Sequence, residues 1–373
     1  MLLSRVVPAA LLPGILAMSV IAAAPDPAGQ TPTPGPPAAP AQAGQAPAAP
    51  RGPAREITPI TAELFRARNG NWHTIFLVTP AGIVLGDPIN VDFARWLKGE
   101  LAARFTQPVR YVVYSHSHYD HASGGEAFAD TATFVAHENM LRNMDGRYPH
   151  MPGDMYDRND NGVIDPDEIG IPTKAAPGIC GLGPNSFAAM DRNKDGRIPP
   201  QELQADIRRP DIVYSDRMRL VLGGKTVELL HPGRNHSDDA TVMYFPAERV
   251  VFATEFLADA LVTTTMRSMP SACGAFDGSP MAEWIRSYRS VEALDFDILA
   301  PGHGNLFAKR DVTEAREFFE DLRADVEAGM RAGKSLQELQ ATLMLDKYKD
   351  WVNYERLRVP NITAAYENLK VPR

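Results

Sequence analysis

Cysteines and clusters of basic residues are both scarce in this chain. Only two cysteines, Cys180 and Cys273, occur among its 373 residues, and neither stands near a base in the sequence. No G-x-S-x-G motif is present either, so nothing in the sequence predicts a nucleophilic side chain. Lysine and arginine form no block, and the net charge is −8. This charge pattern disfavours binding to nucleic acids and electrostatic attachment to anionic membranes.

The N-terminal segment has the composition of an export signal. Residues 1–5 carry one positive charge, residues 6–24 are apolar and rich in alanine, and the small residues Ala22, Ala23 and Ala24 suit a signal peptidase. The alternative is an uncleaved membrane anchor, which Pro8 and Pro13 disfavour. We therefore predict a signal peptide over residues 1–24, a periplasmic or secreted protein, and no stable membrane insertion after cleavage.

Residues 25–55 form a linker rich in proline and alanine, without apolar side chains large enough for a core. In an oxidising compartment the two cysteines could form a disulfide or stay as two free thiols, and the sequence leaves both open.

The remaining chain, residues 56–373, has the patterns of a globular domain. Apolar runs predict strands over 74–79, 83–85, 133–136, 218–222, 241–245 and 249–253, and helical periodicity appears over 91–105 and in the C-terminal part. Two capping boxes are predicted at helix starts, Asp311 with Glu314 and Ser335 with Glu338.

A cluster of potential metal ligands follows the apolar run at residues 111–113. His116, His118, Asp120 and His121 form an H-x-H-x-D-H motif in the loop that leaves this predicted strand. Neutral imidazole and carboxylate groups suit zinc or iron. In an extended chain His116 and His118 project to one side and can reach the same ion. Asp120 and His121 then point elsewhere, which predicts a second ion beside the first.

The motif resembles the signature of the metallo-β-lactamase-fold superfamily. Two later segments extend the likeness: G-R-N-H-S-D-D, which contains His236, and P-G-H-G, which contains His303. The resemblance implies an α+β fold, the four-layer αβ/βα sandwich. It also implies two zinc ions per chain, one held by His116, His118 and His236 and the other by Asp120, His121 and His303.

The resemblance further implies a hydrolase acting on a small molecule. Two ions that share a water lower its pKa towards ~7, so that a metal-bound hydroxide attacks the substrate. Asp120 is then the catalytic residue that orients this nucleophile and takes its proton. Where related hydrolases carry a bridging aspartate, this chain has Glu255, for which three roles are open: bridging the ions, binding one of them, or contacting the bound water. No cysteine occupies this position, which excludes an Asp-Cys-His second site.

Residues 147–210 differ in composition and contain two stretches with the spacing of calcium loops. The predicted ligands of the first loop are Asp157, Asn159, Asn161, Val163, Asp165 and Glu168, and those of the second are Asp191, Asn193, Asp195, Arg197 and Glu202. Alternating oxygen donors, a glycine at position 6 and a final glutamate are what an EF-hand loop requires. The flanking segments are rich in proline and cannot supply the long helices of a sensor. We therefore predict an inserted EF-hand-like subdomain with two structural calcium ions.

The substrate itself is not encoded in any motif. Ester, thioester, lactone, β-lactam and phosphoester substrates all fit the predicted centre. Trp72 and His73 precede a predicted strand and are candidate substrate-binding residues. Two other functions are open: a non-haem iron oxidoreductase of the sulfur dioxygenase type, since iron accepts the same ligands, and a calcium-dependent binding protein with a vestigial metal site.

Overall fold

The computed structural model describes residues 53–146, 161–168, 190–254 and 279–370, together with Asp157, Asn159, residues 187–188, Met269, Pro270 and Phe276. The predicted signal peptide, most of the linker, Cys180, Cys273 and Glu255 lie outside the described residues. The first described strand begins at Arg55, close to the predicted start of the domain.

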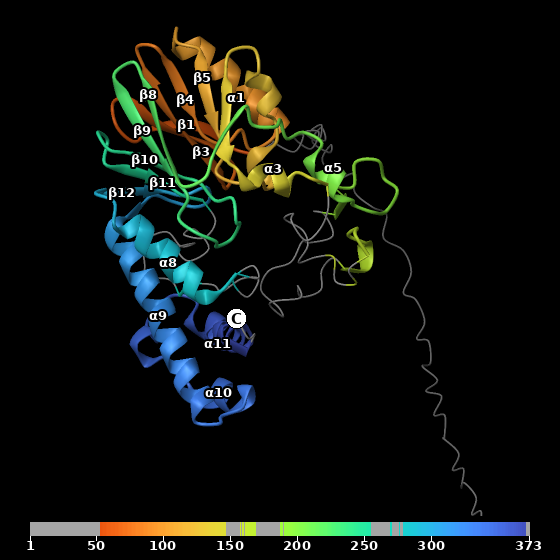
Figure 1. Cartoon of the computed structure of the whole chain (residues 1–373), viewed down its shortest axis with the longest axis vertical. Coiled ribbons are helices and arrows are strands. Elements are labelled where there is room, and N and C mark those ends of the chain that lie inside the picture. Colours follow the sequence, from red (N-terminus) through yellow and green to blue (C-terminus); the bar gives the residue numbers. More distant parts are fainter. Residues whose placement is uncertain are drawn as a thin grey trace, which may run out of the picture. The chain divides into compact units, whose positions relative to one another are not determined.

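Two sheets form the centre of the described domain (Figure 1). The first runs in the order β1-β2-β3-β4-β5-β6-β7 and the second in the order β13-β12-β11-β10-β9-β8. The strands of the first are β1 Arg55–Pro59, β2 Leu64–Asn69, β3 Trp72–Thr79, β4 Gly82–Leu85, β5 Val109–Val113, β6 Thr133–His137 and β7 Ile212–Tyr214. Those of the second are β8 Arg217–Leu222, β9 Lys225–Leu230, β10 Val242–Phe245, β11 Val250–Phe252, β12 Ile298–Ala300 and β13 Phe307–Ala308.

Strand direction explains how loops gather at one edge. β4, β5, β6 and β7 are mutually parallel, so the segments that leave β4 and β5 emerge side by side. In the second sheet β11 and β12 are also parallel, while β8, β9, β10 and β11 are antiparallel. Polar residues that follow such strands are therefore brought together, as expected at the carboxyl ends of parallel strands.

Helices connect and flank the strands of the described residues. They are α1 Val91–Arg104, α2 Tyr119–Ala122, η1 Gly125–Phe128, α3 Asn139–Asn143, η2 Pro166–Glu168, α5 Pro200–Gln204, α8 Met281–Glu292, α9 Lys309–Arg331, α10 Leu336–Thr342, η3 Asp346–Tyr348 and α11 Tyr354–Lys370. None of them is long and apolar enough to cross a membrane.

Three hydrophobic cores define four layers. One core packs α1 residues such as Phe93 and Leu97 against the first sheet. A second joins the inner faces of the two sheets, with Val113 and Phe252 among its buried members. The third packs the second sheet against α8, α9 and α11, where Tyr288 and Phe319 are buried. This is the mixed α/β sandwich that the sequence predicted.

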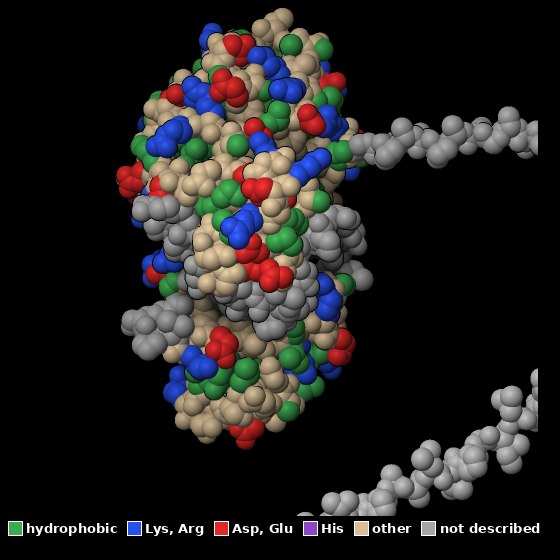
Figure 2. Space-filling model, turned by 90° about the vertical axis from the view of Figure 1, so that its right-hand side faces the viewer, with side chains coloured by type: hydrophobic (Ala, Val, Ile, Leu, Met, Phe, Trp, Pro, Cys, Tyr) green, Lys and Arg blue, Asp and Glu red, His purple; other side chains and the backbone are tan. Residues whose placement is uncertain are grey.

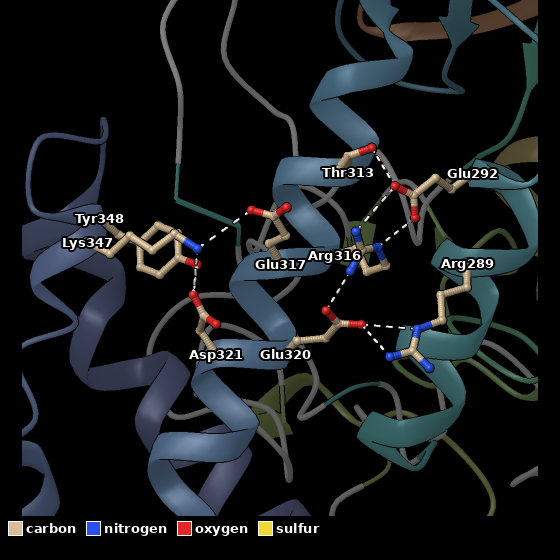
Figure 3. A network of polar contacts seen from close by, with 9 residues as sticks. All are labelled: Arg289, Glu292, Thr313, Arg316, Glu317, Glu320, Asp321, Lys347 and Tyr348. Atoms are coloured by element: carbon tan, nitrogen blue, oxygen red, sulfur yellow. Dashed lines mark hydrogen bonds and ion pairs between the residues drawn. The ribbon is translucent and has the colours of Figure 1, made fainter.

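Ion pairs connect the outer helices (Figure 3). Arg316 on α9 reaches Glu292 at the end of α8 at 2.6 Å and Glu320 on α9 itself at 2.5 Å. On the other side of α9, Asp321 accepts hydrogen bonds from Lys347 and Tyr348 of η3. Acidic and basic side chains also lie interspersed over the sheet-bearing part of the face in Figure 2.

One of the two predicted capping boxes is correct. Ser335 accepts a hydrogen bond from the Glu338 backbone N–H at 3.2 Å, and Glu338 accepts one from the Ser335 backbone N–H at 2.7 Å. The box of Asp311 with Glu314 is wrong, because α9 begins at Lys309 and Asp311 is already inside it. Asp311 instead accepts from the backbone N–H of Ala308 at 2.7 Å, which satisfies a donor one turn earlier than predicted.

The two predicted loops at 157–168 and 191–202 lie against each other. Ile164 and Ile198 exchange two backbone hydrogen bonds of 3.0 Å, which form a short antiparallel bridge. In each loop the first aspartate accepts from backbone N–H groups four and five residues on, and Gly162 and Gly196 adopt positive φ of 87° and 82°. Beneath the bridge Ile164, Met190, Ile198 and Leu203 form a small core of their own. We call this assembly the paired loops.

Candidate metal centre

Two groups of three side chains converge at the sheet edge. The first contains His116, His118 and His236, and the second contains Asp120, His121 and His303. Within each group the candidate donor atoms all lie within 4.8 Å of one another. These are the two sets predicted from the sequence, so the expected grouping of the six side chains matches the structure.

Each side chain arrives from a loop that follows a strand. His116 and His118 follow β5, and Asp120 and His121 lie on the short helix α2. His236 comes from the loop between β9 and β10, and His303 from the loop between β12 and β13. The Thr241 backbone N–H donates to the Ser115 carbonyl at 2.6 Å, which holds the loops of the two sheets together beside the centre.

Ring nitrogens in both groups face one another. His236 Nε2 lies 2.9 Å from His118 Nδ1, and His121 Nε2 lies 3.1 Å from His303 Nε2. Two ligands at zinc–nitrogen distances in a tetrahedron are separated by roughly 3.3 Å, so these nitrogens are close to the spacing that one ion requires. The rings of His116 and His121 are 4.9 Å apart, which makes the two groups neighbours. The donor set therefore fits two divalent ions.

A buried carboxylate that the sequence reasoning did not assign to the site supports both groups. Asp87, which follows β4, is fully buried and accepts from the Ser115 backbone N–H at 2.7 Å and from Ser115 Oγ at 2.6 Å. Its Oδ2 also lies 3.2 Å from His121 Nδ1. Since a carboxylate accepts, the Nδ1 of His121 carries the proton, and its Nε2 is the nitrogen available to a metal.

The same carboxylate orients His116 through Ser115. Ser115 Oγ donates to Asp87 and lies 2.9 Å from His116 Nδ1, so that ring nitrogen donates to the hydroxyl. Hydrogen bonds of this kind fix the ring orientation and the tautomer of metal-ligating histidines. Asp87 could have been found from the sequence, because it ends a strand parallel to the strand that carries the motif.

The loop that carries His303 is held by β2 and β3. Arg66 on β2 donates to the carbonyls of Pro301 and Gly304 at 3.1 and 2.6 Å, and the backbone N–H of His73 on β3 donates to Gly302 at 2.7 Å. A side chain at Gly302 would place Cβ 2.9 Å from His121, so only glycine fits this approach. Burial, followed by the neighbouring Arg68, lowers the pKa of Arg66 to about 10.

The two candidate substrate-binding residues lie in different surroundings. Trp72 is 38% exposed, donates its indole N–H to Asp120 Oδ2 at 3.0 Å, and packs edge-on against His303 at 5.5 Å between ring centres. His73 is buried, with Nδ1 2.9 Å from the Asn71 carbonyl. Burial, with Arg66 as the next cause, lowers the pKa of His73 to about 3. Glu255 lies outside the described residues.

Comparison with known proteins agrees with this geometry. The family model described as the metallo-beta-lactamase superfamily matches residues 100–303, more than half of the chain. The chain belongs to the metallo-β-lactamase superfamily, whose fold typically binds zinc.

Two curated proteins and a solved structure are related more distantly. The chain is 22% identical over 285 residues to the 2,4-dinitroanisole O-demethylase subunit alpha of Nocardioides sp. (strain JS1661), covering 75% of this chain and 67% of that one. It is 24% identical over 237 residues to a linear primary-alkylsulfatase of Pseudomonas sp. (strain ATCC 19151), covering 63% of this chain but 42% of that protein. The stereoselective inverting sec-alkylsulfatase Pisa1 from Pseudomonas sp. superposes with a TM-score of 0.55 at 14% identity, over 85% of this chain and 50% of the other. This last likeness supports the fold alone.

Proposed function

We propose that the chain is a metal-dependent hydrolase whose two zinc ions are held by the two groups of three side chains. The observation that carries the proposal is the convergence of six candidate ligand side chains from three loop segments, with the donor atoms of each group within 4.8 Å of one another. Superfamily membership and a hydrolytic relative, an alkylsulfatase, support the same class of reaction.

When bound, the ions supply Lewis acidity and make water nucleophilic at neutral pH. The residues of the chain hold this centre in place and handle the proton. Asp87 and Ser115 keep His121 and His116 in one tautomer each. Asp120, whose side chain is 29% exposed, is oriented by the Trp72 indole and takes the proton of the attacking water. We further propose that Glu255 contributes a carboxylate to the second group.

The bond cleaved belongs to an ester, thioester, lactone, β-lactam or phosphoester, and the alkylsulfatase relative adds sulfate esters as a class to be tested. These substrates share an electrophilic centre with an oxygen that a cation can polarise.

Metal analysis together with a substrate panel tests the proposal. The full chain purified from its native envelope is expected to hold two zinc ions, to lose hydrolysis on chelation and to recover it with zinc. His303→Ala should lose one ion and the activity, whereas the control Val221→Ala, at an exposed position on β8, should keep both. One iron per chain with oxidation of a sulfur compound would identify the non-haem iron oxidoreductase instead.

No hydrolysis across the whole panel with zinc restored would favour a calcium-dependent binding protein with a vestigial metal site. The panel therefore includes carboxylic, thio-, phosphate and sulfate esters, lactones and β-lactams.

We also propose that the paired loops bind two calcium ions in a structural role. Supporting this, Glu168 and Glu202, the last residue of each predicted loop, accept backbone N–H groups of Asn159 and Asn193 at 3.1 and 2.9 Å. Calcium titration of the chelated full chain by calorimetry should show two binding events, and Glu202→Gln should remove one. A calcium-dependent rise in the binding of a hydrophobic dye would contradict the structural role.

We also propose that the protein is exported. Cleavage after residue 24 would release a periplasmic or secreted domain behind a proline-rich linker, with a small molecule as its partner and no nucleic acid. The N-terminal sequence of the protein recovered from the envelope tests this, and retention of residues 1–24 in a membrane fraction would contradict it.

A further inference from the structure

A cavity of about 280 Å³ lies between the metal centre and the paired loops. One wall comes from the metal side, where Trp72, Asp120 and Ser123 line it, and the opposite wall includes Met190, Arg192 and Leu203 of the paired loops. The other lining residues are Pro53, Asn69, Ile89, Asn90, Tyr119, Glu202 and Asp206. Residues of the inserted segment thus stand opposite a candidate metal ligand across one cavity.

The two walls are in direct contact at their base. Tyr119, between the candidate ligands His118 and Asp120, packs against the small core of the paired loops. Its hydroxyl lies 3.4 Å from Met190 Sδ. The position of the insertion wall is therefore coupled to the metal loop by packing.

The described lining of the cavity is largely apolar, with charged side chains at its rim. Trp72, Ile89, Tyr119, Met190 and Leu203 supply aromatic and aliphatic surface. The charged groups are three carboxylates, Asp120, Glu202 and Asp206, and one guanidinium, Arg192, which is paired with Asp206. The proposed cations sit on Asp120 and Glu202, and Arg192 neutralises Asp206, so an uncharged ring meets no unbalanced charge here and can lie against the Trp72 indole, which is 38% exposed.

We propose that this cavity is the subsite for an uncharged, apolar organic group of the substrate, about the size of a substituted single aromatic ring. A cavity of about 150 Å³ is enough for benzene, so the larger volume leaves room for a substituent. Leu203 and Met190 set the size limit, which makes the insertion a determinant of specificity. The inference rests on the proposed hydrolytic function, since Asp120 is placed at the reacting end.

Binding of small probes to the full chain with zinc bound tests the subsite without turnover. Benzyl alcohol is expected to bind, and methanol, which has the hydroxyl but lacks the ring, at least about 10-fold more weakly. Leu203→Phe fills the cavity and should weaken benzyl alcohol at least about 10-fold. Leu203→Ala enlarges it and should improve binding of 2-naphthalenemethanol, a gain that misfolding cannot produce.

The control is Val221→Phe, which adds the same ring at a position that is 62% exposed on β8. In turnover, Leu203→Phe should lower the ratio of kcat/KM for phenyl over methyl esters at least about 10-fold, and Val221→Phe should leave that ratio unchanged.

The outcomes separate the two proposals. Probe binding that follows the Leu203 series without hydrolysis of any member of the substrate panel would overturn the proposed function and support the subsite. Ester hydrolysis with identical ratios in Leu203→Phe and Val221→Phe, and unaltered benzyl alcohol binding, would overturn the subsite and support the function. Equal binding of methanol and benzyl alcohol would contradict a subsite for an aromatic ring.

Discussion

The metal centre and the paired loops are two candidate ion sites that are built in opposite ways. The metal centre takes its ligands from loops of both sheets, far apart in the sequence, and places His116 and His121 at 2% and 0% exposure. Each of the paired loops takes its candidate ligands from twelve consecutive residues and orients them by hydrogen bonds to their own backbone.

This difference predicts how far each site is ordered by the protein fold and how far by a bound ion. Around the metal centre the folded sheets and the carboxylate of Asp87 position the histidines before any ion arrives. Among the residues that the structure describes, the core of the paired loops has four buried apolar side chains, so an ion has more of the ordering to supply. Loss of a side chain at the metal centre should therefore abolish chemistry with little effect on folding, and loss of one in the paired loops should do the reverse.

The largest effect is expected at a ligand of the metal centre. His303→Ala removes one nitrogen of the second group, and we expect one ion to be lost and kcat/KM to fall at least about 100-fold, because outer partners alone are worth about 10- to 100-fold. Metal content and ester hydrolysis measure this. His231→Gln is the matched control, since this histidine stacks on His137 outside both groups. Full activity of His303→Ala would exclude its role as a ligand.

A smaller effect is expected from the buried carboxylate. Asp87→Asn keeps the shape but removes the charge that holds His121 and Ser115, and we expect zinc affinity to fall about 10- to 100-fold. Competition with a zinc chelator measures it, and Asp92→Asn, at an exposed position on α1, is the control. If both variants bind zinc equally, the second group does not depend on this carboxylate.

The next effect in size is expected at the contact between the metal centre and the paired loops. Tyr119→Ala empties the space beside Met190, and we expect calcium affinity of the second loop to fall about 10-fold, which is about 1.4 kcal/mol. Zinc content should stay at the level of the parent chain. Tyr119→Phe keeps the ring and loses only the contact of the hydroxyl with Met190 Sδ, so its effect should be within about 1 kcal/mol. Calorimetric calcium titration of both variants measures the two losses. An equal loss of calcium affinity in Tyr119→Ala and Tyr119→Phe would show that the hydroxyl, and not the ring, couples the metal loop to the paired loops.

The smallest effect concerns pH and a buried histidine, His137, that belongs to neither group of candidate ligands. Burial, and then the adjacent His231, lowers the pKa of His137, while Glu138 and Asp238 oppose this. Its Nδ1 accepts from the Asn139 N–H and its Nε2 donates to the Ser215 carbonyl, an arrangement that only the neutral ring can make.

The unfolded chain therefore binds a proton below pH ~6.5 that the folded chain does not. The free energy of unfolding should fall as the pH drops below about 6.5, by at most about 1.4 kcal/mol per pH unit. Urea unfolding of the parent chain and His137→Gln between pH 7.5 and 5.0 measures the difference. An equal pH dependence in both would show that this ring does not contribute.

Much of the fold and the site could be predicted from the sequence because the patterns are local. The apolar run before His116 forms β5, and Ser335 caps α10 as expected. The error at Asp311 has a local cause as well: the same carboxylate serves as the third residue of a helix that begins earlier, and the sequence motif does not distinguish the two registers.

Other features depended on neighbours in space. The sequence suggests that Arg66 is an ordinary charged residue of a strand. In the structure it is 7% exposed, and its hydrogen bonds hold the loop of His303. The exposed Trp72 contacts Asp120 only because the fold brings the start of β3 beside the loops that carry Asp120 and His303. Such contacts join residues distant along the chain, and no local pattern encodes them.

By itself, the sequence determined the candidates: which side chains are predicted to bind metal, how they are predicted to group, and which two loops have oxygen donors at calcium spacing. These follow from residue type and short spacing, which a strand or a tight loop converts directly into geometry. Only the tertiary structure decided that Asp87 supports the histidines, that Trp72 reaches Asp120, and that Leu203 faces the metal side across a cavity. The physical reason is that packing of the two sheets and the insertion, not spacing along the chain, sets which side chains meet.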